Sequence, residues 1–257
     1  MIRHTGLMHP MNVIVTDSPE QAFQCAADMI TDEIRRSPTP VLGLATGRTM
    51  ENIYQILVQK HEIGALDFSG TTSFNLDEYV DLAPTDPNSY HHYMQDHLFA
   101  HVNMQANRAH VPNGIAPDLE VECTRYEAAI HAAGGIDLQL LGIGETGHIG
   151  FNEPPSAFDS RTRVVHLDEV TRRQNSGMFG NDPDRVPPRA LTMGVGTILD
   201  ARRLVLVAVG EGKAAIVNEA LNGPISETVS ASAIRLHDNA TIILDKAAAS
   251  DWKRTTR

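Results

Sequence analysis

Six short apolar runs along the chain have the length and the aliphatic content of buried β-strands. Near-continuous runs of Val, Ile and Leu, rather than alternating ones, are typical of parallel strands that are covered on both faces. The pattern therefore predicts a parallel sheet with strands at residues 11–16, 40–46, 71–79, 136–144, 203–210 and 240–245.

Segments with helical character separate these runs. Ser18 is suited to cap a helix that has Pro19 in its first turn and Gln21 three residues after the cap. This helix is predicted to end near Arg36, and others are predicted at 49–61, 88–99, 119–133 and 211–222. The alternation of strands and helices indicates βαβ units. We therefore predict an α/β fold with a doubly wound, mostly parallel, Rossmann-like sheet and helices on both faces.

The length of 257 residues suits one large α/β domain. We predict a loose leader at residues 1–10 and a single domain at 11–257. Residues 152–192 are rich in Pro, Gly, Asn and charged residues, and they predict an irregular segment. Because long loops in compact domains often cover active sites, we expect this segment to act as a lid.

The net charge of −11 argues against nucleic acid as a partner, since such proteins usually present a basic face. It does not exclude an anionic small molecule, because a pocket can be locally positive. No apolar run reaches the roughly 20 residues that span a bilayer. Cys25 and Cys123 lack the spacing of a zinc site or a disulfide framework. These features predict a cytoplasmic protein that acts on a small molecule and not on a membrane.

Four polar motifs come directly after predicted strands: ATGRT, NLDEY, GETGH and GEGK. In open α/β sheets, ligands bind beyond the carboxyl ends of the strands. We therefore expect the four motifs to gather around one site.

The ATGRT motif places Thr46, Gly47, Arg48 and Thr49 between a strand and a helix. Backbone N–H groups, hydroxyls and the positive end of a helix dipole favour a phosphate group there. The spacing differs from that of a nucleoside triphosphate loop. Lys213 follows another strand and either adds a positive charge to the same anion or is a solvated helix lysine.

Asp77 and Glu78 are adjacent, so in a strand they point to opposite faces and only one of them faces a pocket. A partly desolvated carboxylate has a raised pKa and can remove a carbon-bound proton. The alternative is a carboxylate in a turn or at a helix cap. His148 titrates near neutral pH, and Glu153 can fix its tautomer, which suits proton transfer at sugar oxygens. The alternative for this pair is a solvated surface loop.

Gly142, Gly144 and Gly147 match the dinucleotide-binding pattern GxGxxG. That pattern requires a helix at the third glycine, and the HIGFNEPP sequence that follows is a poor helix. The glycines instead indicate a sharp turn close to a ligand. The paired histidines at 91–92 and at 97 and 101 have no evident third ligand, so a metal is not expected. We predict no cofactor.

The segments LGLATGRT, FNLDEYVDL, LLGIGETGHIGFNEP, SRTR, ALTMGVGTIL and the region around GEGK resemble glucosamine-6-phosphate deaminases, from about residue 13 to about residue 250. The resemblance implies conversion of glucosamine 6-phosphate and water to fructose 6-phosphate and ammonia, without a metal or an organic cofactor. It implies that Asp77 moves the C2 proton to C1, that His148 opens the ring and that Glu153 orients His148. It also implies that residues 46–49 and Lys213 hold the phosphate.

The chain departs from the pattern of this family at three positions. Thr146 stands where the family usually has Asp or Asn, and Met50 stands where it usually has Pro. Gly177 stands where the family commonly has a lid arginine that reaches the phosphate, and Arg172 and Arg173 are candidates to replace it. These changes keep open a sensor that binds a sugar phosphate without converting it.

Arg163, in SRTR, matches an arginine of the site at which N-acetylglucosamine 6-phosphate activates hexameric family members. Its surroundings match poorly, so we predict weak or absent activation. A homo-oligomer remains open, as does galactosamine 6-phosphate as the substrate, since one hydroxyl contact separates the two epimers. A phosphogluconolactonase-like hydrolase is disfavoured by FNLDEY and GFNEP.

Overall fold

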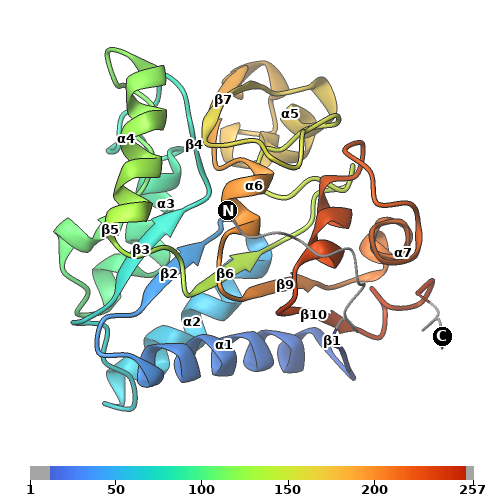
Figure 1. Ribbon diagram of the computed structural model, residues 1–257, viewed down its shortest axis with the longest axis horizontal. Coiled ribbons are helices and arrows are strands. Elements are labelled where there is room, and N and C mark those ends of the chain that lie inside the picture. The colour runs from blue at the N-terminus through green and yellow to red at the C-terminus, as the bar shows by residue number, and fades with distance from the viewer. Residues whose placement is uncertain (1–11, 253–257) are drawn as a thin grey trace.

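The computed structural model describes residues 12–252, so the predicted leader at 1–10 lies outside them. Within this range, seven parallel strands form a central sheet, which confirms the predicted fold class (Figure 1). The strand order is β1 (Asn12–Thr16), β10 (Ala240–Asp245), β9 (Leu204–Ala208), β6 (Leu138–Leu141), β2 (Val41–Leu44), β3 (Thr72–Asn75) and β5 (Ala109–His110).

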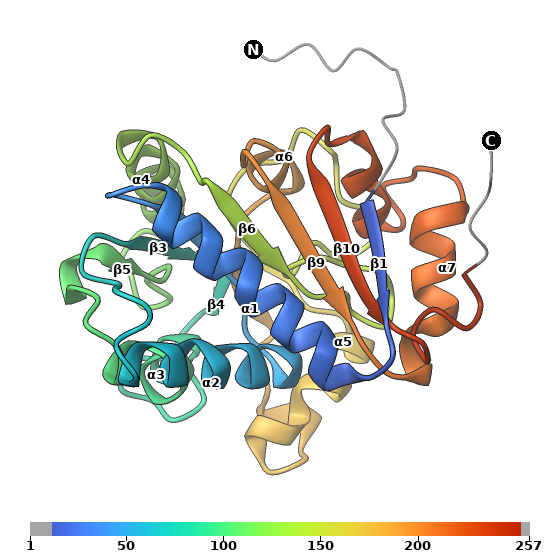
Figure 2. The ribbon, with the colours of Figure 1, turned by 90° about the horizontal axis from the view of Figure 1, so that it is seen from below.

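Helices cover both faces of this sheet. Helices α1 (Pro19–Arg36) and α2 (Arg48–Glu62) lie on one face, and α4 (Leu119–Ala132) and α6 (Val195–Leu199) lie on the other (Figures 1 and 2). Helix α1 begins as predicted, because Ser18 Oγ accepts a hydrogen bond from the backbone N–H of Gln21 at 3.4 Å. The remaining α-helices are α3 (Tyr90–His97), α5 (Glu169–Asn175) and α7 (Ala214–Asn222).

The predicted strand at 71–79 is in fact two strands that belong to different sheets. After β3 the chain leaves the central sheet and forms β4 (Asp77–Tyr79). Leu76 joins the two strands: its N–H donates to Leu44 O at 3.0 Å, and its carbonyl accepts from Met193 N at 2.7 Å. Apart from the partly exposed Thr72, both strands are buried, so the pattern of apolar residues gives no sign of the break.

The segment 152–192 contains more regular structure than predicted. It forms β7 (Arg163–His166), α5 and β8 (Arg189–Thr192), besides 3-10 helices at Ser176–Phe179 and Pro183–Arg185. Strands β4, β8 and β7 make a small antiparallel sheet. The prediction of an irregular segment was wrong because these short elements are rich in polar residues and lack the continuous apolar runs of the central strands. We keep the name lid segment for residues 152–192.

The order of the central strands reverses between β2 and β6. From β2 the chain continues outward to β3 and β5, whereas from β6 it continues the other way to β9 and β10. Such a reversal opens a crevice at the carboxyl ends of the strands, where α/β proteins bind ligands. Helix α5 of the lid segment lies at this end of the sheet (Figure 2).

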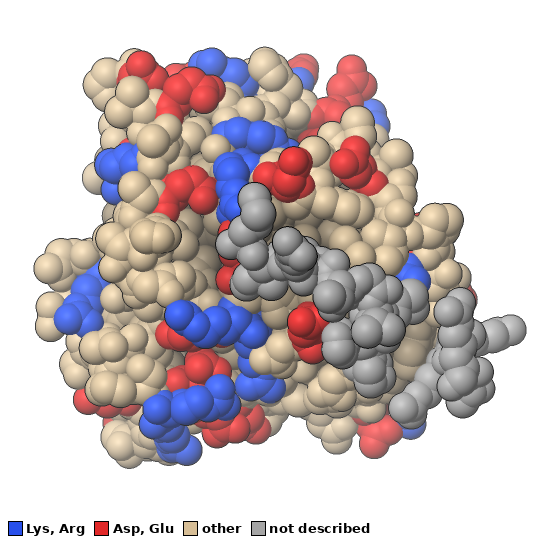
Figure 3. Space-filling model, viewed as in Figure 1, with Lys and Arg blue, Asp and Glu red and all other residues tan. Residues whose placement is uncertain are grey.

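The face shown in Figure 3 carries Lys and Arg side chains interspersed with Asp and Glu. None of the helices in residues 12–252 combines the length and the apolar character needed to cross a bilayer.

Candidate active site

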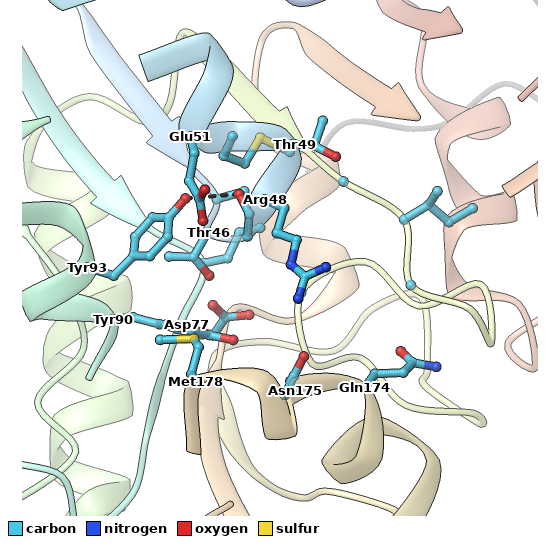
Figure 4. Close-up of a pocket in the computed structure, with 18 of the residues that line it drawn as sticks. Thr46, Arg48, Thr49, Glu51, Asp77, Tyr90, Tyr93, Gln174, Asn175 and Met178 are labelled. Atoms are coloured by element: carbon cyan, nitrogen blue, oxygen red, sulfur yellow. Dashed lines mark hydrogen bonds between the residues drawn. The ribbon is translucent and has the colours of Figure 1, made fainter. Parts of the chain in front are cut away.

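A cavity of about 730 Å³ opens at the reversal of strand order. The segments that follow β2, β3, β6 and β9 line it, together with residues of the lid segment (Figure 4). The structure thus brings the four polar motifs together, as the sequence predicts. Of the predicted site residues, those that line the cavity are Thr46, Gly47, Arg48, Thr49, Asp77, His148 and Lys213.

The positive end of α2 faces this cavity. Gly47 precedes the helix with φ of +113°, a left-handed conformation that favours glycine, and no side chain caps the helix. The phenolic hydroxyl of Tyr93 donates to Gly47 O at 2.9 Å and fixes the turn. Lys213 faces the cavity from the junction that precedes α7, and burial lowers the pKa of its ammonium group. The arrangement provides a cationic and dipolar site for an anion.

Asp77 and Glu78 point to opposite sides, as the alternation of a strand requires. Asp77 faces the cavity, and its pKa is raised to about 8, first by burial and then by the charge of Glu78. Glu78 points toward the start of α3 and accepts hydrogen bonds from the backbone N–H groups of Tyr90 and His91, both at 2.9 Å. Burial raises the pKa of Glu78 to about 7. Asp77 is therefore the carboxyl group available to a ligand, whereas Glu78 caps a helix.

His148 is 9% exposed at the wall of the cavity. Its Nδ1 lies 2.9 Å from Thr146 Oγ1 and 3.8 Å from the nearer Glu153 oxygen. Burial, followed by the positive charge of Lys213, lowers the pKa of His148 to about 4. The imidazole is therefore neutral near neutral pH, with one nitrogen that donates and one that accepts a hydrogen bond.

Glu153 approaches His148 but does not line the cavity. Both of its oxygens are buried, and the hydroxyl of Thr171 and the backbone of Asp168 lie close enough to influence its pKa. Burial is the main cause that raises the pKa of this carboxyl group. Glu153 is placed to act on a ligand through His148 rather than by direct contact.

The glycines of the GETGH motif make room for His148. A Cβ atom at Gly144 would lie 2.1 Å from Nε2 of His148, and Gly147 has φ of +80°. No helix begins at Gly147, so the backbone lacks the helix N-terminus that a dinucleotide pyrophosphate needs. Within the described part of the chain, no group of three or more His, Cys, Asp or Glu side chains is arranged to hold a metal ion.

Comparison with known proteins decides the family. The family model for glucosamine-6-phosphate isomerases/6-phosphogluconolactonase matches residues 16–243. The chain belongs to this family. It is 48% identical over 239 residues to a glucosamine-6-phosphate deaminase of Bacillus velezensis, covering 93% of this chain and 99% of that protein. It is 49% identical over 245 residues to a glucosamine-6-phosphate deaminase of Rhodopirellula baltica, covering 95% and 97%.

Solved structures agree with this assignment. A monomeric glucosamine-6-phosphate deaminase superposes with a TM-score of 0.92 at 47% identity, covering 94% of this chain and 100% of that one. A 6-phosphogluconolactonase from Trypanosoma cruzi superposes with a TM-score of 0.74 at 21% identity, covering 97% and 100%. The second likeness shows a shared fold only.

The candidate replacements for the lid arginine do not reach the site of this family member. Arg172 Nη2 donates to Pro183 O at 2.8 Å, and Arg173 lies 3.9 Å from Glu169 on the surface. Neither side chain lines the cavity. The guanidinium that lies beside Gly177 belongs to Arg48, whose Nη2 would be 3.5 Å from a Cβ atom at Gly177.

Arg163 does not line the cavity, and its guanidinium forms hydrogen bonds with side chains of the lid segment. Its Nη1 donates to Asn152 Oδ1 at 2.8 Å, and its Nη2 donates to Ser156 Oγ at 3.0 Å. Burial lowers the pKa of this guanidinium. The side chain thereby braces the turn that holds Glu153.

Several residues that line the cavity carry no signal in the sequence. They come from α2, from α3 and from the lid segment, and their approach to the cavity depends on tertiary packing (Figure 4). These residues are Glu51, Tyr90, Tyr93, Gln174, Asn175 and Met178.

Proposed function

We propose that this protein is a glucosamine-6-phosphate deaminase, which converts glucosamine 6-phosphate and water to fructose 6-phosphate and ammonia. The observation that carries the proposal is the joint placement of Asp77, His148 and the N-terminus of α2 in one cavity. Asp77 suits the removal of a carbon-bound proton, His148 suits the opening of a sugar ring, and the N-terminus of α2 suits a phosphate group. Relatives named for this activity align over nearly the whole chain.

The reaction begins with opening of the sugar ring. His148 accepts the proton of the C1 hydroxyl and returns a proton to the ring oxygen as the bond between C1 and that oxygen breaks. A neutral imidazole suits this exchange because it holds one acceptor and one donor nitrogen. Thr146 and Glu153 orient the ring of His148 through Nδ1.

Asp77 then moves a proton between two carbons. Its carboxylate removes the proton from C2 while the ammonium group of the substrate passes a proton to the C1 oxygen, which gives an enolamine. Asp77 then returns its proton to C1, which leaves an iminium at C2. Water adds at C2 and ammonia departs. A carboxylate with a raised pKa is a stronger base, although roughly one-tenth of the free enzyme carries it ionised at neutral pH when its pKa is about 8.

The phosphate group anchors the substrate during these steps. The N-terminus of α2, with Thr46, Gly47, Arg48 and Thr49, takes the anion, and Lys213 adds a charge from the junction that precedes α7. Binding energy at this distant group holds C1 and C2 near His148 and Asp77.

Ammonia release by the purified protein tests the proposal, with glucosamine 6-phosphate, galactosamine 6-phosphate and unphosphorylated glucosamine as substrates. We expect fast release from glucosamine 6-phosphate alone. Release from the galactosamine ester alone would instead identify the C4 epimer as the substrate. No release from any of them, with either sugar phosphate still raising the melting temperature, would identify a sensor.

The assembly and location of the protein are separate proposals. We propose a monomer, because a solved relative at 47% identity is described as monomeric, and light scattering should then give the mass of one chain. The cytoplasmic location remains a prediction from the sequence, and the free thiols of Cys25 and Cys123 support it.

A further inference from the structure

Gly177 is a glycine that its own backbone does not require. It lies in the 3-10 helix Ser176–Phe179 of the lid segment, and it is not one of the glycines with positive φ. A Cβ atom there would make ordinary contact, at 3.5 Å, with Nη2 of Arg48. A longer side chain would therefore compete with the guanidinium of Arg48 for the same space.

Arg48 extends across the cavity from the first turn of α2. Figure 4 shows its guanidinium pointing toward the lid segment, near Asn175. Within residues 12–252 no carboxylate forms an ion pair with it, although its side chain carries five N–H donors. Glu51, in the same turn, also lines the cavity but lies beside Thr46 and Tyr93 (Figure 4).

The packing of a neighbouring aromatic residue fixes the position of Gly177. Phe179, two residues later, is 3% exposed and packs edge-on against Tyr79, with ring centroids 5.4 Å apart. Tyr79 belongs to β4, the strand that carries Asp77. The space beside Gly177 is therefore held at a defined place relative to the proposed base.

We propose that Gly177 is a specificity-determining residue, because its missing side chain forms a socket in which Arg48 reaches a phosphate monoester beneath the lid segment. The anion is then held between a forked guanidinium from α2 and the ammonium of Lys213. A guanidinium suits this role because its parallel N–H groups match two phosphate oxygens. The identity of the full substrate in this inference rests on the proposed function, whereas the binding of a phosphate group does not.

A double-mutant cycle tests the coupling between the two residues. Calorimetry with inorganic phosphate measures anion affinity without turnover. We expect Arg48→Gln and Gly177→Leu each to weaken phosphate binding about tenfold, and the double variant to be little weaker than either single one. Gly177→Ala grades the size of the added side chain and should weaken phosphate binding less than Gly177→Leu, since its Cβ makes ordinary contact with Arg48 at 3.5 Å.

Two further variants keep the result interpretable. Lys213→Gln also removes a cation, but Lys213 is not within 4 Å of a Cβ atom at Gly177, so its effect should add to that of Gly177→Leu. Moving the guanidinium, as Arg48→Ser with Gly177→Arg, should restore affinity relative to Arg48→Ser alone. Additive losses at 48 and 177, or unchanged affinity in Arg48→Gln, would overturn the inference.

Melting temperatures separate a folding defect from a loss of binding in each variant. If Gly177→Leu fails to fold, the exchanged pair and Arg48→Gln still decide the inference. If no aminosugar phosphate is converted while the cycle remains non-additive, the socket stands and the proposed function fails. If conversion occurs and the cycle is additive, the proposed function stands and the socket fails.

Discussion

The hydroxyl of Thr146 lies 2.9 Å from Nδ1 of His148 and is the group in hydrogen-bond contact with this nitrogen. The carboxylate of Glu153 is 3.8 Å from the same nitrogen. Since a hydroxyl can donate or accept, it can stabilise either neutral tautomer of the imidazole and follow its change during proton transfer. Thr146 is thus a positioning residue for His148.

Thr146→Val should lower kcat about tenfold, because the isosteric methyl group cannot hydrogen-bond with His148, and should leave KM nearly unchanged. Thr146→Ser should keep most of the activity. Steady-state kinetics with glucosamine 6-phosphate measures both. Equal kcat values for the valine variant and the unchanged protein would show that this contact does not position the imidazole.

The rate should rise with pH as Asp77 ionises. Because its pKa is raised to about 8 and its proposed role needs the carboxylate, kcat/KM should increase from about pH 6 and level off above about pH 9. Protonation of His148, with a pKa of about 4, lies outside this range. The amino group of the substrate titrates in a similar pH range. A carbon-13 NMR titration of the Asp77 carboxyl group should therefore show whether Asp77 causes the rise in kcat/KM. A flat profile would contradict the assignment.

Asp77→Asn should abolish exchange of the C2 proton while sugar phosphate still binds, and it should also stabilise the fold. The folded state holds the Asp77 proton up to about pH 8, whereas the unfolded chain releases it near pH 3.8. Stability is therefore full below the lower value and declines as pH rises to the upper one. The gain in Asp77→Asn should grow across this window to about 2–5 kcal/mol.

Denaturant titrations across this pH window measure that gain. Glu78→Gln is the contrasting variant, because it brings an amide donor toward the backbone N–H groups of Tyr90 and His91. It should lower the free energy of unfolding. If Asp77→Asn is less stable than the unchanged protein at neutral pH, burial of this carboxyl does not carry the expected penalty.

Lys213→Ala should mainly raise KM, because it removes a charge that holds the phosphate without touching the reacting carbons. It should also raise the pKa of His148 toward its usual value, since the charge of Lys213 contributes to lowering it. Proton NMR of the imidazole measures the second effect. A fall in kcat alone would show that Lys213 does not anchor the phosphate.

N-acetylglucosamine 6-phosphate should not activate the enzyme. The guanidinium of Arg163 already donates to Asn152 and Ser156, so its N–H groups serve the fold. Arg163→Gln should accordingly lower the melting temperature by a few degrees, about the effect of losing 1 kcal/mol. Rates measured with and without the acetylated ester test the first claim, and strong activation would refute it.

The fold could be predicted because six central strands lie within short apolar runs and because the cap of α1 is made by residues next to it in the chain. The lid segment could not, since β7 and β8 have only two apolar residues each and are defined by pairing with each other and with β4. The seventh central strand, β5, has two residues and was missed for the same reason.

The candidate site was predictable where its residues follow strands. Asp77, His148 and the residues of ATGRT come directly after apolar runs, so topology places them together. The closeness of Arg48 to Gly177 could not be predicted, because the two residues lie far apart in the chain and the guanidinium lies where a side chain at position 177 would be. The sequence shows that Gly177 lacks the arginine common in the family, but not which side chain lies beside it.

The junction at Leu76 determines which way the carboxyl groups of Asp77 and Glu78 point. Its backbone is hydrogen-bonded to Leu44 in the central sheet and to Met193, which follows β8 of the small sheet. These two hydrogen bonds fix the register of the chain at Leu76. Since side chains alternate along a strand, a deletion or insertion of a single residue at this joint would exchange Asp77 and Glu78. The base would then cap a helix, and the capping residue would enter the cavity. The number of residues at this joint therefore decides which of the two carboxyl groups lines the cavity.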